Sequence, residues 1–259
     1  MEIINNINAW KSIRAKLTGT IGFVPTMGSL HRGHQSLVER SMQENDLTVV
    51  SIFINPLQFN DPNDYQNYPQ TLDTDMVLLE QLNVDYLFSP NKEDLYPQSH
   101  TFMIDTDHPY TDILEGKHRP GHFSGVLTIV AKLLNLIAAD RAYFGKKDYQ
   151  QYLLVKAMAR DLFIGTDIIA CDTIRENSNL PYSSRNVRLS LEERSLADKA
   201  IGLIHQTNRQ TIAAIKQELT KLDLDLEYLE IKDKRVYSAI KINTCRIIDN
   251  FSLSEGPSC

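Results

Sequence analysis

Two histidines, His31 and His34, lie three residues apart at the end of the stretch Thr26-Met27-Gly28-Ser29-Leu30-His31-Arg32-Gly33-His34. Side chains at this spacing share one face of a helix, so both imidazoles can reach the same group. The stretch joins an apolar run, residues 20–24, to a segment with a helical pattern, residues 33–44. Unpaired N–H groups and the dipole at a helix N-terminus favour an anion, so we interpret the stretch as a phosphate-binding turn.

The spacing alone leaves two other interpretations open. His-x-x-His also occurs in metal sites, and two histidines near a turn are often surface residues. No cysteine and no acidic cluster lies beside the pair in the sequence to complete a metal shell. Gly28 and Gly33 let the backbone approach a ligand closely, and together with the preceding strand they favour phosphate.

Two further stretches have phosphate-binding character. Gly145-Lys146-Lys147-Asp148 places two ammonium groups directly after the strand-like run 142–144. Tyr182-Ser183-Ser184-Arg185 offers hydroxyls and a guanidinium that can donate to phosphate oxygens. Lysines at an exposed turn are usually only solvated, and serine-rich turns are common helix caps, so neither stretch is decisive by itself.

Other polar residues have equally balanced interpretations. Gln150 and Gln151 can both donate and accept hydrogen bonds, which suits a hydroxyl or carboxylate ligand, although single glutamines are normally surface residues. Arg119 and His122 precede the clearest helix and could add charge beside an anion or simply occupy its first turn. Asp73 and Asp75, at the start of another predicted helix, complement its dipole or, less directly, bind magnesium.

The elements that must position these residues alternate between strand and helix. This alternation predicts parallel strands with crossover helices, hence an α/β doubly wound parallel sheet. Ligands of such sheets bind at the carboxyl ends of the strands, where the residues around 26–34, 55–58 and 145–148 fall. The predicted strands cover 20–24, 47–54, 84–88, 142–144 and 166–171, and the predicted helices cover 33–44, 71–82, 122–137 and 148–159.

The pattern changes after Leu189. Residues 191–222 predict a long helical region, with a possible break near 205–210, followed by strands at 224–231 and 245–248. We therefore expect an α/β domain of residues 1–189 that binds nucleotide and substrate, and a small α+β C-terminal lid domain of residues 190–259.

Composition limits the kind of protein. The 259 residues carry a net charge of −6, which favours neither nucleic acid nor an anionic membrane as a partner. Cys171, Cys245 and Cys259 are far apart and predict neither a disulfide framework nor a Cys-x-x-Cys metal site. The N-terminus lacks a signal-peptide pattern, and no apolar run approaches the roughly 20 residues of a membrane span. These features predict a cytoplasmic protein.

Several stretches together resemble the pantoate–β-alanine ligase (pantothenate synthetase) family of the His-x-Gly-His nucleotidyltransferase superfamily. The resemblance runs from about Phe23 to Leu189 and resumes at residues 246–250. Its five ordered motifs are Phe23-Val24-Pro25-Thr26-Met27-Gly28-Ser29-Leu30-His31-Arg32-Gly33-His34, Phe53-Ile54-Asn55-Pro56-Leu57-Gln58-Phe59, Arg119-Pro120-Gly121-His122-Phe123-Ser124-Gly125-Val126, Phe144-Gly145-Lys146-Lys147-Asp148-Tyr149-Gln150-Gln151 and Ser183-Ser184-Arg185-Asn186.

The resemblance implies a Rossmann-like fold, a homodimer, and a reaction in two half-steps. ATP and (R)-pantoate give pantoyl adenylate and pyrophosphate, with Mg²⁺ bridging the phosphates. The amine of β-alanine then displaces AMP and gives pantothenate.

The same resemblance assigns roles to individual residues. His34 is the proton donor with His31 beside it, and Lys147 and Arg185 face the phosphates. Gln58 and Gln151 hold pantoate, and Gln58 also lies near β-alanine. Ile174 contacts the nucleotide through its backbone, and 182–185 form a mobile phosphate-binding segment. The implied ATP-binding residues are Met27, Gly28, Ser29, Leu30, His31, Arg32, Gly33, His34, Gly145, Lys146, Lys147, Asp148, Ile174, Tyr182, Ser183, Ser184 and Arg185.

The chain departs from the family pattern at several positions. Lys146 replaces the usual acidic residue, which we expect to add positive charge at the ATP site. Tyr182, preceded by Pro181, replaces the usual methionine before the paired serines, which we expect to stiffen the loop. Thr74 replaces an aspartate, which weakens a magnesium assignment at Asp73 and Asp75. The segment 231–246 is short, which puts the geometry of the lid in question.

Two rival functions remain at this point. One is a nucleotidyltransferase that joins ATP to a phosphate ester and stops at a nucleotide product, but such a substrate would require cations at Gln58 and Gln151. The other is a nucleotide-binding protein without activity, which the presence of His31, His34, Lys147 and Arg185 disfavours.

Overall fold

A computed structural model describes residues 1–97 and 102–253. The chain divides into two compact units, and each is considered by itself. The N-terminal unit comprises Met1–Gly145 and Gln150–Cys171, and the C-terminal unit comprises Lys146–Tyr149 and Asp172–Cys259. The N-terminal unit thus ends at Cys171, whereas the predicted boundary lies at residue 189. Assignment of 1–189 to substrate binding and 190–259 to a lid stays a prediction about function.

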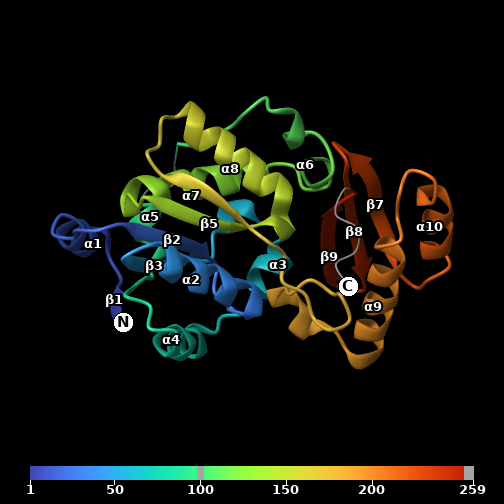
Figure 1. The fold of residues 1–259 in the computed structure, drawn as a ribbon, viewed down its shortest axis with the longest axis horizontal. Coiled ribbons are helices and arrows are strands. Elements are labelled where there is room, and N and C mark those ends of the chain that lie inside the picture. Colours follow the sequence, from blue (N-terminus) through green and yellow to red (C-terminus); the bar gives the residue numbers. More distant parts are fainter. Residues whose placement is uncertain (98–101, 254–259) are drawn as a thin grey trace. The chain divides into compact units, whose positions relative to one another are not determined.

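The N-terminal unit is built on one parallel sheet (Figure 1). Its strand order is β1-β4-β3-β2-β5-β6, which confirms the predicted doubly wound α/β class. From β2 the chain steps outward through β3 and β4, then crosses back to β5 on the other side of β2. The carboxyl ends of β2 and β5 therefore form the switch point where such sheets bind ligands. The strands are β1 Glu2–Ile4, β2 Ile21–Thr26, β3 Leu47–Ile52, β4 Tyr86–Phe88, β5 Arg141–Gly145 and β6 Asp167–Cys171.

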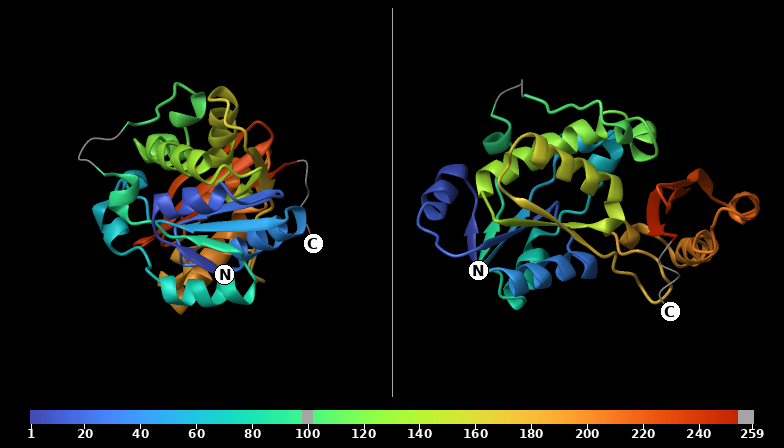
Figure 2. Two further views of the ribbon diagram at one scale, coloured as in Figure 1. Left: turned by 90° about the vertical axis from the view of Figure 1, so that its left-hand side faces the viewer. Right: turned by 45° about the horizontal axis from the view of Figure 1, so that its top comes forward.

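Alternating side chains of the strands supply two separate hydrophobic cores, one on each face of the sheet. On β2, Phe23 belongs to the core shared with α1, α7 and α8, whereas Val24 belongs to the core shared with α2 and α4. Figures 1 and 2 show these helices covering the two faces. Because both faces are buried, the strands consist of continuous apolar runs, which is why they could be recognised in the sequence.

The helices of this unit largely match the predicted ones. The helix predicted at 122–137 is α7, with the same bounds, because its apolar residues recur at helical spacing over four turns. The short β1 and α1 were not predicted. The helical elements are α1 Ile7–Arg14, α2 Arg32–Glu44, η1 Pro56–Gln58, α3 Pro62–Gln66, α4 Leu72–Gln81, α5 Lys92–Leu95, η2 Pro109–Thr111, α6 Glu115–His118, α7 His122–Ile137 and α8 Tyr149–Asp161.

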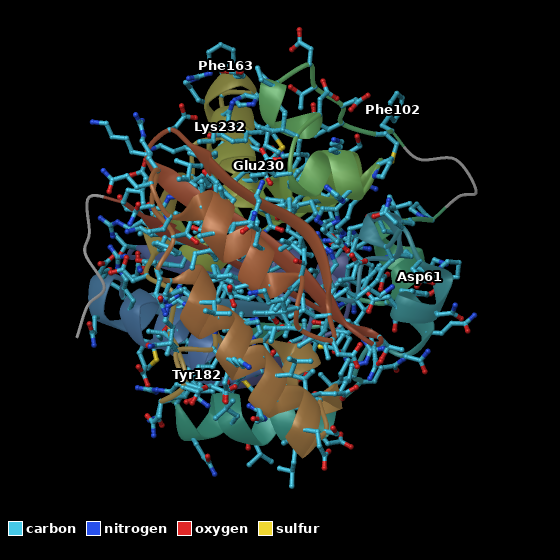
Figure 3. The ribbon with its side chains drawn as sticks, turned by 90° about the vertical axis from the view of Figure 1, so that its right-hand side faces the viewer. Asp61, Phe102, Phe163, Tyr182, Glu230 and Lys232 are labelled. Carbon is cyan, nitrogen blue, oxygen red and sulfur yellow. The ribbon has the colours of Figure 1, made fainter. Side chains whose placement is uncertain are left out.

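The C-terminal unit packs two helices against a three-stranded antiparallel sheet of order β7-β8-β9. The predicted break in the helical region is confirmed, because α9 ends at Ile204 and α10 begins at Ile212. On β7, Leu229 faces the hydrophobic core of this unit, and Glu230 points away from it (Figure 3). The elements are η3 Lys146–Asp148, η4 Ser184–Arg188, α9 Leu191–Ile204, α10 Ile212–Leu219, β7 Asp225–Lys232, β8 Arg235–Ile242 and β9 Cys245–Ser252.

The central strand, β8, was missed in the sequence. The charged run from Lys232 to Arg235 hid a tight hairpin turn, in which Asp233 and Lys234 have φ angles of 50° and 61°. A turn with two positive φ angles usually contains Asn or Gly, so a lysine there gave no recognisable signal. The apparently short segment 231–246 therefore contains all of β8 and the turns on either side of it.

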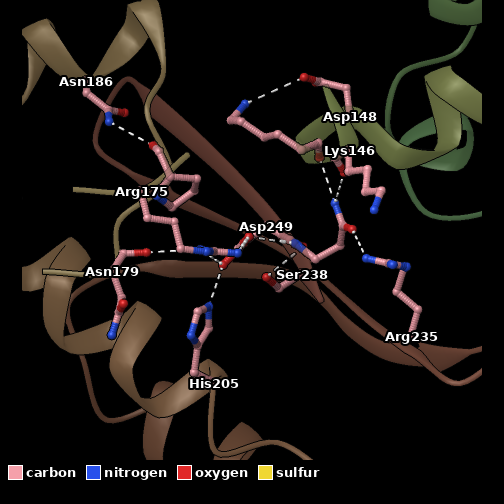
Figure 4. A network of polar contacts seen from close by, with 12 residues as sticks. Lys146, Asp148, Arg175, Asn179, Asn186, His205, Arg235, Ser238 and Asp249 are labelled. Atoms are coloured by element: carbon pink, nitrogen blue, oxygen red, sulfur yellow. Dashed lines mark hydrogen bonds and ion pairs between the residues drawn. The ribbon is translucent and has the colours of Figure 1, made fainter. Parts of the chain in front are cut away.

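One fully buried carboxylate organises the C-terminal unit (Figure 4). Arg175 donates to both oxygens of Asp249 at 2.8 Å, and Nε2 of His205 lies 2.8 Å from Oδ2. Burial by itself would raise the pKa of Asp249, but the hydrogen bonds from His205 and Arg175 outweigh it, so its pKa lies below the ordinary value. The carboxylate is thus stabilised in its charged form.

Cys171 and Cys245 are buried thiols, and Cys259 lies outside the described residues. Across residues 1–97 and 102–253, none of the helices has the length and apolar character of a transmembrane segment.

We expect Asp249→Asn to lower the free energy of unfolding at neutral pH by about 3 kcal/mol, because it leaves the Arg175 guanidinium without its charge partner. The folded-state pKa lies below the unfolded value of about 3.9, so the carboxylate stabilises above pH 5 and its contribution is lost as pH falls through the folded pKa. Denaturant unfolding at pH 7 and at pH 3 measures this. The difference in the free energy of unfolding between the wild type and the variant should be smaller at pH 3 than at pH 7. An equal difference at both pH values would contradict the assignment.

Candidate active site

The turn between β2 and α2 is shaped by backbone constraints and one hydroxyl. The Thr26 hydroxyl donates to the Ser51 carbonyl at 2.8 Å and accepts the Gly28 N–H at 3.2 Å. Gly28 has a φ of 82°, and a Cβ at that position would lie 3.1 Å from Oδ2 of Asp75. The positive φ angle favours glycine here, and the nearby Asp75 carboxylate leaves little room for a Cβ.

Asp75 holds the next two residues of the turn. Its two carboxylate oxygens accept the N–H groups of Ser29 and Leu30, each at 2.8 Å, and Oδ2 also accepts from the Thr71 hydroxyl at 3.1 Å. Asp75 is only 2% exposed, so it is committed to the turn within the protein. The dipole and magnesium interpretations of Asp75 both missed this role.

His31 and His34 form a reciprocal cap at the start of α2. Nδ1 of His31 accepts the Gly33 N–H at 3.1 Å, and Nδ1 of His34 accepts the His31 N–H at 3.4 Å. The two rings stack with centroids 4.0 Å apart. Because each Nδ1 acts as an acceptor, this geometry places the proton of each neutral ring on Nε2.

This arrangement refines the predicted anion site. The Gly33 amide is already bonded to His31, so the helix presents imidazole Nε2–H groups in addition to backbone amides. Paired N–H donors at a helix N-terminus suit the oxygen atoms of a phosphate chain, and they can stabilise charge that develops on those oxygens.

Gln58 lies at the end of η1, after β3, and is oriented by a buried asparagine. Nδ2 of Asn55 donates to Oε1 of Gln58 at 3.0 Å and to the Gly125 carbonyl at 3.1 Å. Burial raises the pKa of Tyr96, whose hydroxyl remains protonated and donates to Oδ1 of Asn55 at 2.8 Å. The Asn55 amide is thereby fixed, and the NH₂ group of Gln58 has no protein acceptor among the described residues.

Arg119 and His122 support the backbone of Gln58. Nδ1 of His122 donates to the Gln58 carbonyl at 2.8 Å, and Arg119 donates to the same oxygen at 3.3 Å. A Cβ at Gly125 would lie 2.2 Å from the Leu57 carbonyl oxygen, so glycine permits this close approach of α7 to η1. These residues therefore position Gln58.

The adjacent glutamines at the start of α8 differ in role. Gln150 is buried and bridges the loop before α6, since its Nε2 donates to the Tyr110 carbonyl at 3.0 Å and its Oε1 accepts the Glu115 N–H at 3.0 Å. Gln151 is partly exposed, and its side chain forms no hydrogen bond with the described residues. Its side chain can therefore bind a ligand without first breaking a protein contact.

In the C-terminal unit, the two lysines of the 145–148 motif are in different environments. Nζ of Lys146 lies 2.6 Å from Oδ1 of Asp172, so an acid that sequence analysis did not consider balances the added charge. Nζ of Lys147 lies 3.9 Å from Oδ2 of Asp148, which is beyond hydrogen-bond distance. Lys147 is thus better suited than Lys146 to meet an anion.

The segment before α9 brings two predicted nucleotide contacts together. The Tyr182 N–H donates to the Ile174 carbonyl at 3.1 Å, next to the bridge between Arg175 and Pro181. The Ser183 hydroxyl accepts the Arg185 N–H at 3.3 Å and caps η4, whereas Ser184 is buried. Tyr182, labelled in Figure 3, begins the extended stretch that leads into this cap.

The predicted site residues therefore fall in two groups. The N-terminal unit contains residues 27–34, Gln58, Gly145 and Gln151, and the C-terminal unit contains Lys146–Asp148, Ile174 and 182–185. Within the N-terminal unit, His31 and His34 stack against each other, and within the C-terminal unit, Tyr182 is hydrogen-bonded to Ile174. Meeting of the two groups over one ATP stays a prediction.

We expect Asp75→Asn to lower the free energy of unfolding by about 1–3 kcal/mol without any ligand present, because one buried amide donor of the turn loses its acceptor. Denaturant unfolding of the protein with EDTA, free of ATP, measures this. Asp73→Asn, an exposed change two residues away, is the matched control and should cost only a few tenths of a kcal/mol. Unchanged stability of Asp75→Asn in EDTA would show that Asp75 does not hold the turn.

Comparison with known proteins connects this geometry to one family. The sequence profile of pantoate-beta-alanine ligase matches residues 2–252. A pantothenate synthetase of Francisella tularensis subsp. mediasiatica is 44% identical, with 100% of both chains covered. The crystal structure of a Francisella tularensis pantoate-beta-alanine ligase complexed with beta-gamma ATP and beta-alanine has a TM-score of 0.96 at 44% identity, with 100% of both chains covered. A pantothenate synthetase from Thermus thermophilus has a TM-score of 0.90 at 37% identity, covering 98% of this chain and 99% of that one. The expected resemblance is confirmed, and this chain belongs to the pantoate–β-alanine ligase family.

Proposed function

We propose that this chain catalyses the ATP-dependent condensation of (R)-pantoate with β-alanine through pantoyl adenylate, releasing pyrophosphate and AMP. The observation that carries the proposal is the stacked His31–His34 pair at the carboxyl end of β2, whose geometry places an N–H donor on each Nε2. Family membership supplies the reaction, and a related ligase from Francisella tularensis has been crystallised with an ATP ligand and β-alanine.

In the first half-step, the pantoate carboxylate attacks the α-phosphorus of ATP and pyrophosphate leaves. Such a transfer needs in-line placement and stabilisation of charge on the phosphate oxygens more than covalent help from the protein. We assign that stabilisation to hydrogen bonds that the Nε2–H groups of His31 and His34 donate to the phosphate oxygens, including those of the leaving group. Lys147 is two residues beyond Gly145, the last residue of β5, and we propose that it and Arg185 act on the same triphosphate.

Pantoate binding is assigned to Gln58 and Gln151. The oxygen of Gln58 is occupied by Asn55, so its NH₂ group is the part directed to a ligand. A neutral donor suits the hydroxyl or carboxylate of pantoate, whereas a phosphate ester would call for cations. This chemistry favours the ligase over a nucleotidyltransferase that uses a phosphate ester.

In the second half-step, the β-alanine amine attacks the acyl carbon of the adenylate and AMP leaves. The adenylate is a mixed anhydride that water would hydrolyse, so the site must exclude water until the amine arrives. We propose that the segment 182–185, with the lid role assigned to residues 190–259, closes over the intermediate.

We further propose that Mg²⁺ enters with ATP as part of the substrate. Within residues 1–97 and 102–253, no three His, Cys, Asp or Glu side chains gather as a metal site, and Asp75 is committed to its turn, so these residues do not form a magnesium cage. A homodimer in the cytoplasm completes the proposal.

A two-stage assay tests this function. ATP and pantoate are added first, and β-alanine second. We expect pyrophosphate release that depends on pantoate, followed by AMP release only after β-alanine is added. Pyrophosphate without later AMP would support the rival nucleotidyltransferase, and ATP binding without pyrophosphate would support a protein that only binds nucleotide.

We expect His34→Ala to reduce the rate of pantoate-dependent pyrophosphate release by about 10²-fold or more, because it removes a preorganised donor to the phosphates. Single-turnover kinetics with saturating ATP and pantoate measures this. The variant also loses the cap to the His31 N–H, so thermal unfolding must show that it remains folded. Near-normal turnover of a folded variant would refute the role of His34.

We expect Gln58→Ala to raise the KM for pantoate about tenfold or more and to leave the KM for ATP within about twofold, because the lost NH₂ group faces the hydroxy acid. Steady-state kinetics with each substrate varied in turn gives both constants. Equal weakening of both substrates would show that Gln58 does not belong to a separate pantoate pocket.

A further inference from the structure

We infer that Asn250 is a positioning residue that fixes the Lys146–Lys147 backbone and so directs the Lys147 side chain toward ATP. This inference rests on the proposed role of Lys147 in the first half-step. All residues in the argument belong to the C-terminal unit, and most of their contacts are drawn in Figure 4.

The side-chain amide of Asn250 donates both of its N–H groups to the backbone of the segment Lys146–Asp148, here called the lysine loop. Nδ2 donates to the Lys146 carbonyl at 2.9 Å and to the Lys147 carbonyl at 2.7 Å. Asn250 is only 5% exposed, so water does not substitute readily for these bonds. Two consecutive carbonyls therefore point at one amide, which fixes the two peptide planes that flank Lys147.

Arg235 prevents the amide from turning over. NH1 of Arg235 donates to Oδ1 of Asn250 at 2.7 Å, so oxygen and nitrogen cannot exchange places without loss of all three bonds. The guanidinium of Arg235 also lies over the Tyr149 ring, 4.0 Å from its centroid. Tyr149 directly follows the lysine loop. Arg235 thus contacts the residue after the loop, and Asn250 binds the carbonyls within the loop.

The strand that carries Asn250 is anchored in turn. The Asn250 N–H donates to Oδ1 of Asp249 at 2.8 Å, and that carboxylate is fixed by Arg175 and His205. The two inner residues of this chain of contacts, Asp249 and Asn250, are buried, and the residues at its ends are partly buried. A buried polar network with every member bonded holds a single arrangement.

The fixed backbone places the ammonium groups of Lys146 and Lys147 in different surroundings. The Lys147 side chain is 20% exposed, and the ion pair that the described residues offer its ammonium is a loose contact of 3.9 Å to Asp148. The neighbouring Lys146 is paired with Asp172 at 2.6 Å. The two lysines of the fixed backbone thus differ in pairing: the Lys146 ammonium is held in a close ion pair, and the Lys147 ammonium is not.

Asn250→Asp tests this directly, since it keeps the shape and the acceptor for Arg235 but replaces the NH₂ group by an oxygen that repels both carbonyls. We expect the rate of pantoate-dependent pyrophosphate release to fall about tenfold or more and the Kd for ATP to rise, with the KM for pantoate within about twofold. Asn250→Ala removes the amide without adding charge and gives the same measurement if the aspartate variant does not fold. Thermal unfolding of each variant reports the folded fraction.

Asn208→Asp is the matched control in the same unit. Oδ1 of Asn208 only accepts, from the N–H groups of Gln210 and Thr211, so the aspartate keeps both bonds. We expect its turnover and ATP affinity to match those of the wild type.

A double-mutant cycle separates positioning from general destabilisation. In a Lys147→Ala background, the Asn250 change should have little further effect on turnover or on the Kd for ATP, because its influence passes through the lysine. The inference would be overturned if the Asn250 change reduced turnover by the same factor in the wild-type and Lys147→Ala backgrounds. It would also be overturned if Asn250→Ala kept the turnover and the ATP affinity of the wild type. Absence of pyrophosphate release by the wild type would instead refute the proposed function. The Kd for ATP, measured for the two single variants and the double variant, would still decide the role of Asn250.

Discussion

Side chains buried in other elements hold the loops that carry the proposed chemistry. Asp75, from α4, binds two consecutive amides of the turn after β2, and without it the turn would lose the carboxylate that stabilises the positive-φ backbone at Gly28 and Ser29. The position of His31 as the cap of α2 follows from that turn. The stacked imidazoles are thus as dependent on Asp75 as on their own helix.

The lysine loop uses the complementary chemistry. There the loop presents carbonyls rather than amides, and the partner is the Asn250 carboxamide rather than a carboxylate. The Asp249 carboxylate lies one step further from the loop, where Arg175 neutralises its charge. Both loops are therefore fixed by groups matched to their backbone polarity, and ATP itself need not order them.

The sequence predicted the parts of the structure that depend on local pattern. The apolar runs of β2 and β3 and the periodicity of α7 indicated the parallel sheet. The ligand contacts that the motifs around His34, Gln58 and Lys147 predicted stay predictions. The sequence could not predict the roles of Asp75 or Asn250, because each acts on a loop distant in sequence. The strand β8 was hidden because Lys234 adopts a positive φ that lysine rarely shows.

A chain with a net charge of −6 must gather favourable interactions locally to hold a triphosphate. Two of its cations near the predicted motifs are paired, Lys146 with Asp172 and Arg175 with Asp249. The histidines contribute differently, since their Nε2–H groups donate even when the rings are neutral. Donors of this kind stabilise developing charge on a phosphate oxygen without the desolvation cost of burying further full charges. The ammonium charge that Lys146 brings in place of the acid of the family pattern is balanced by Asp172, whose carboxylate lies 2.6 Å away.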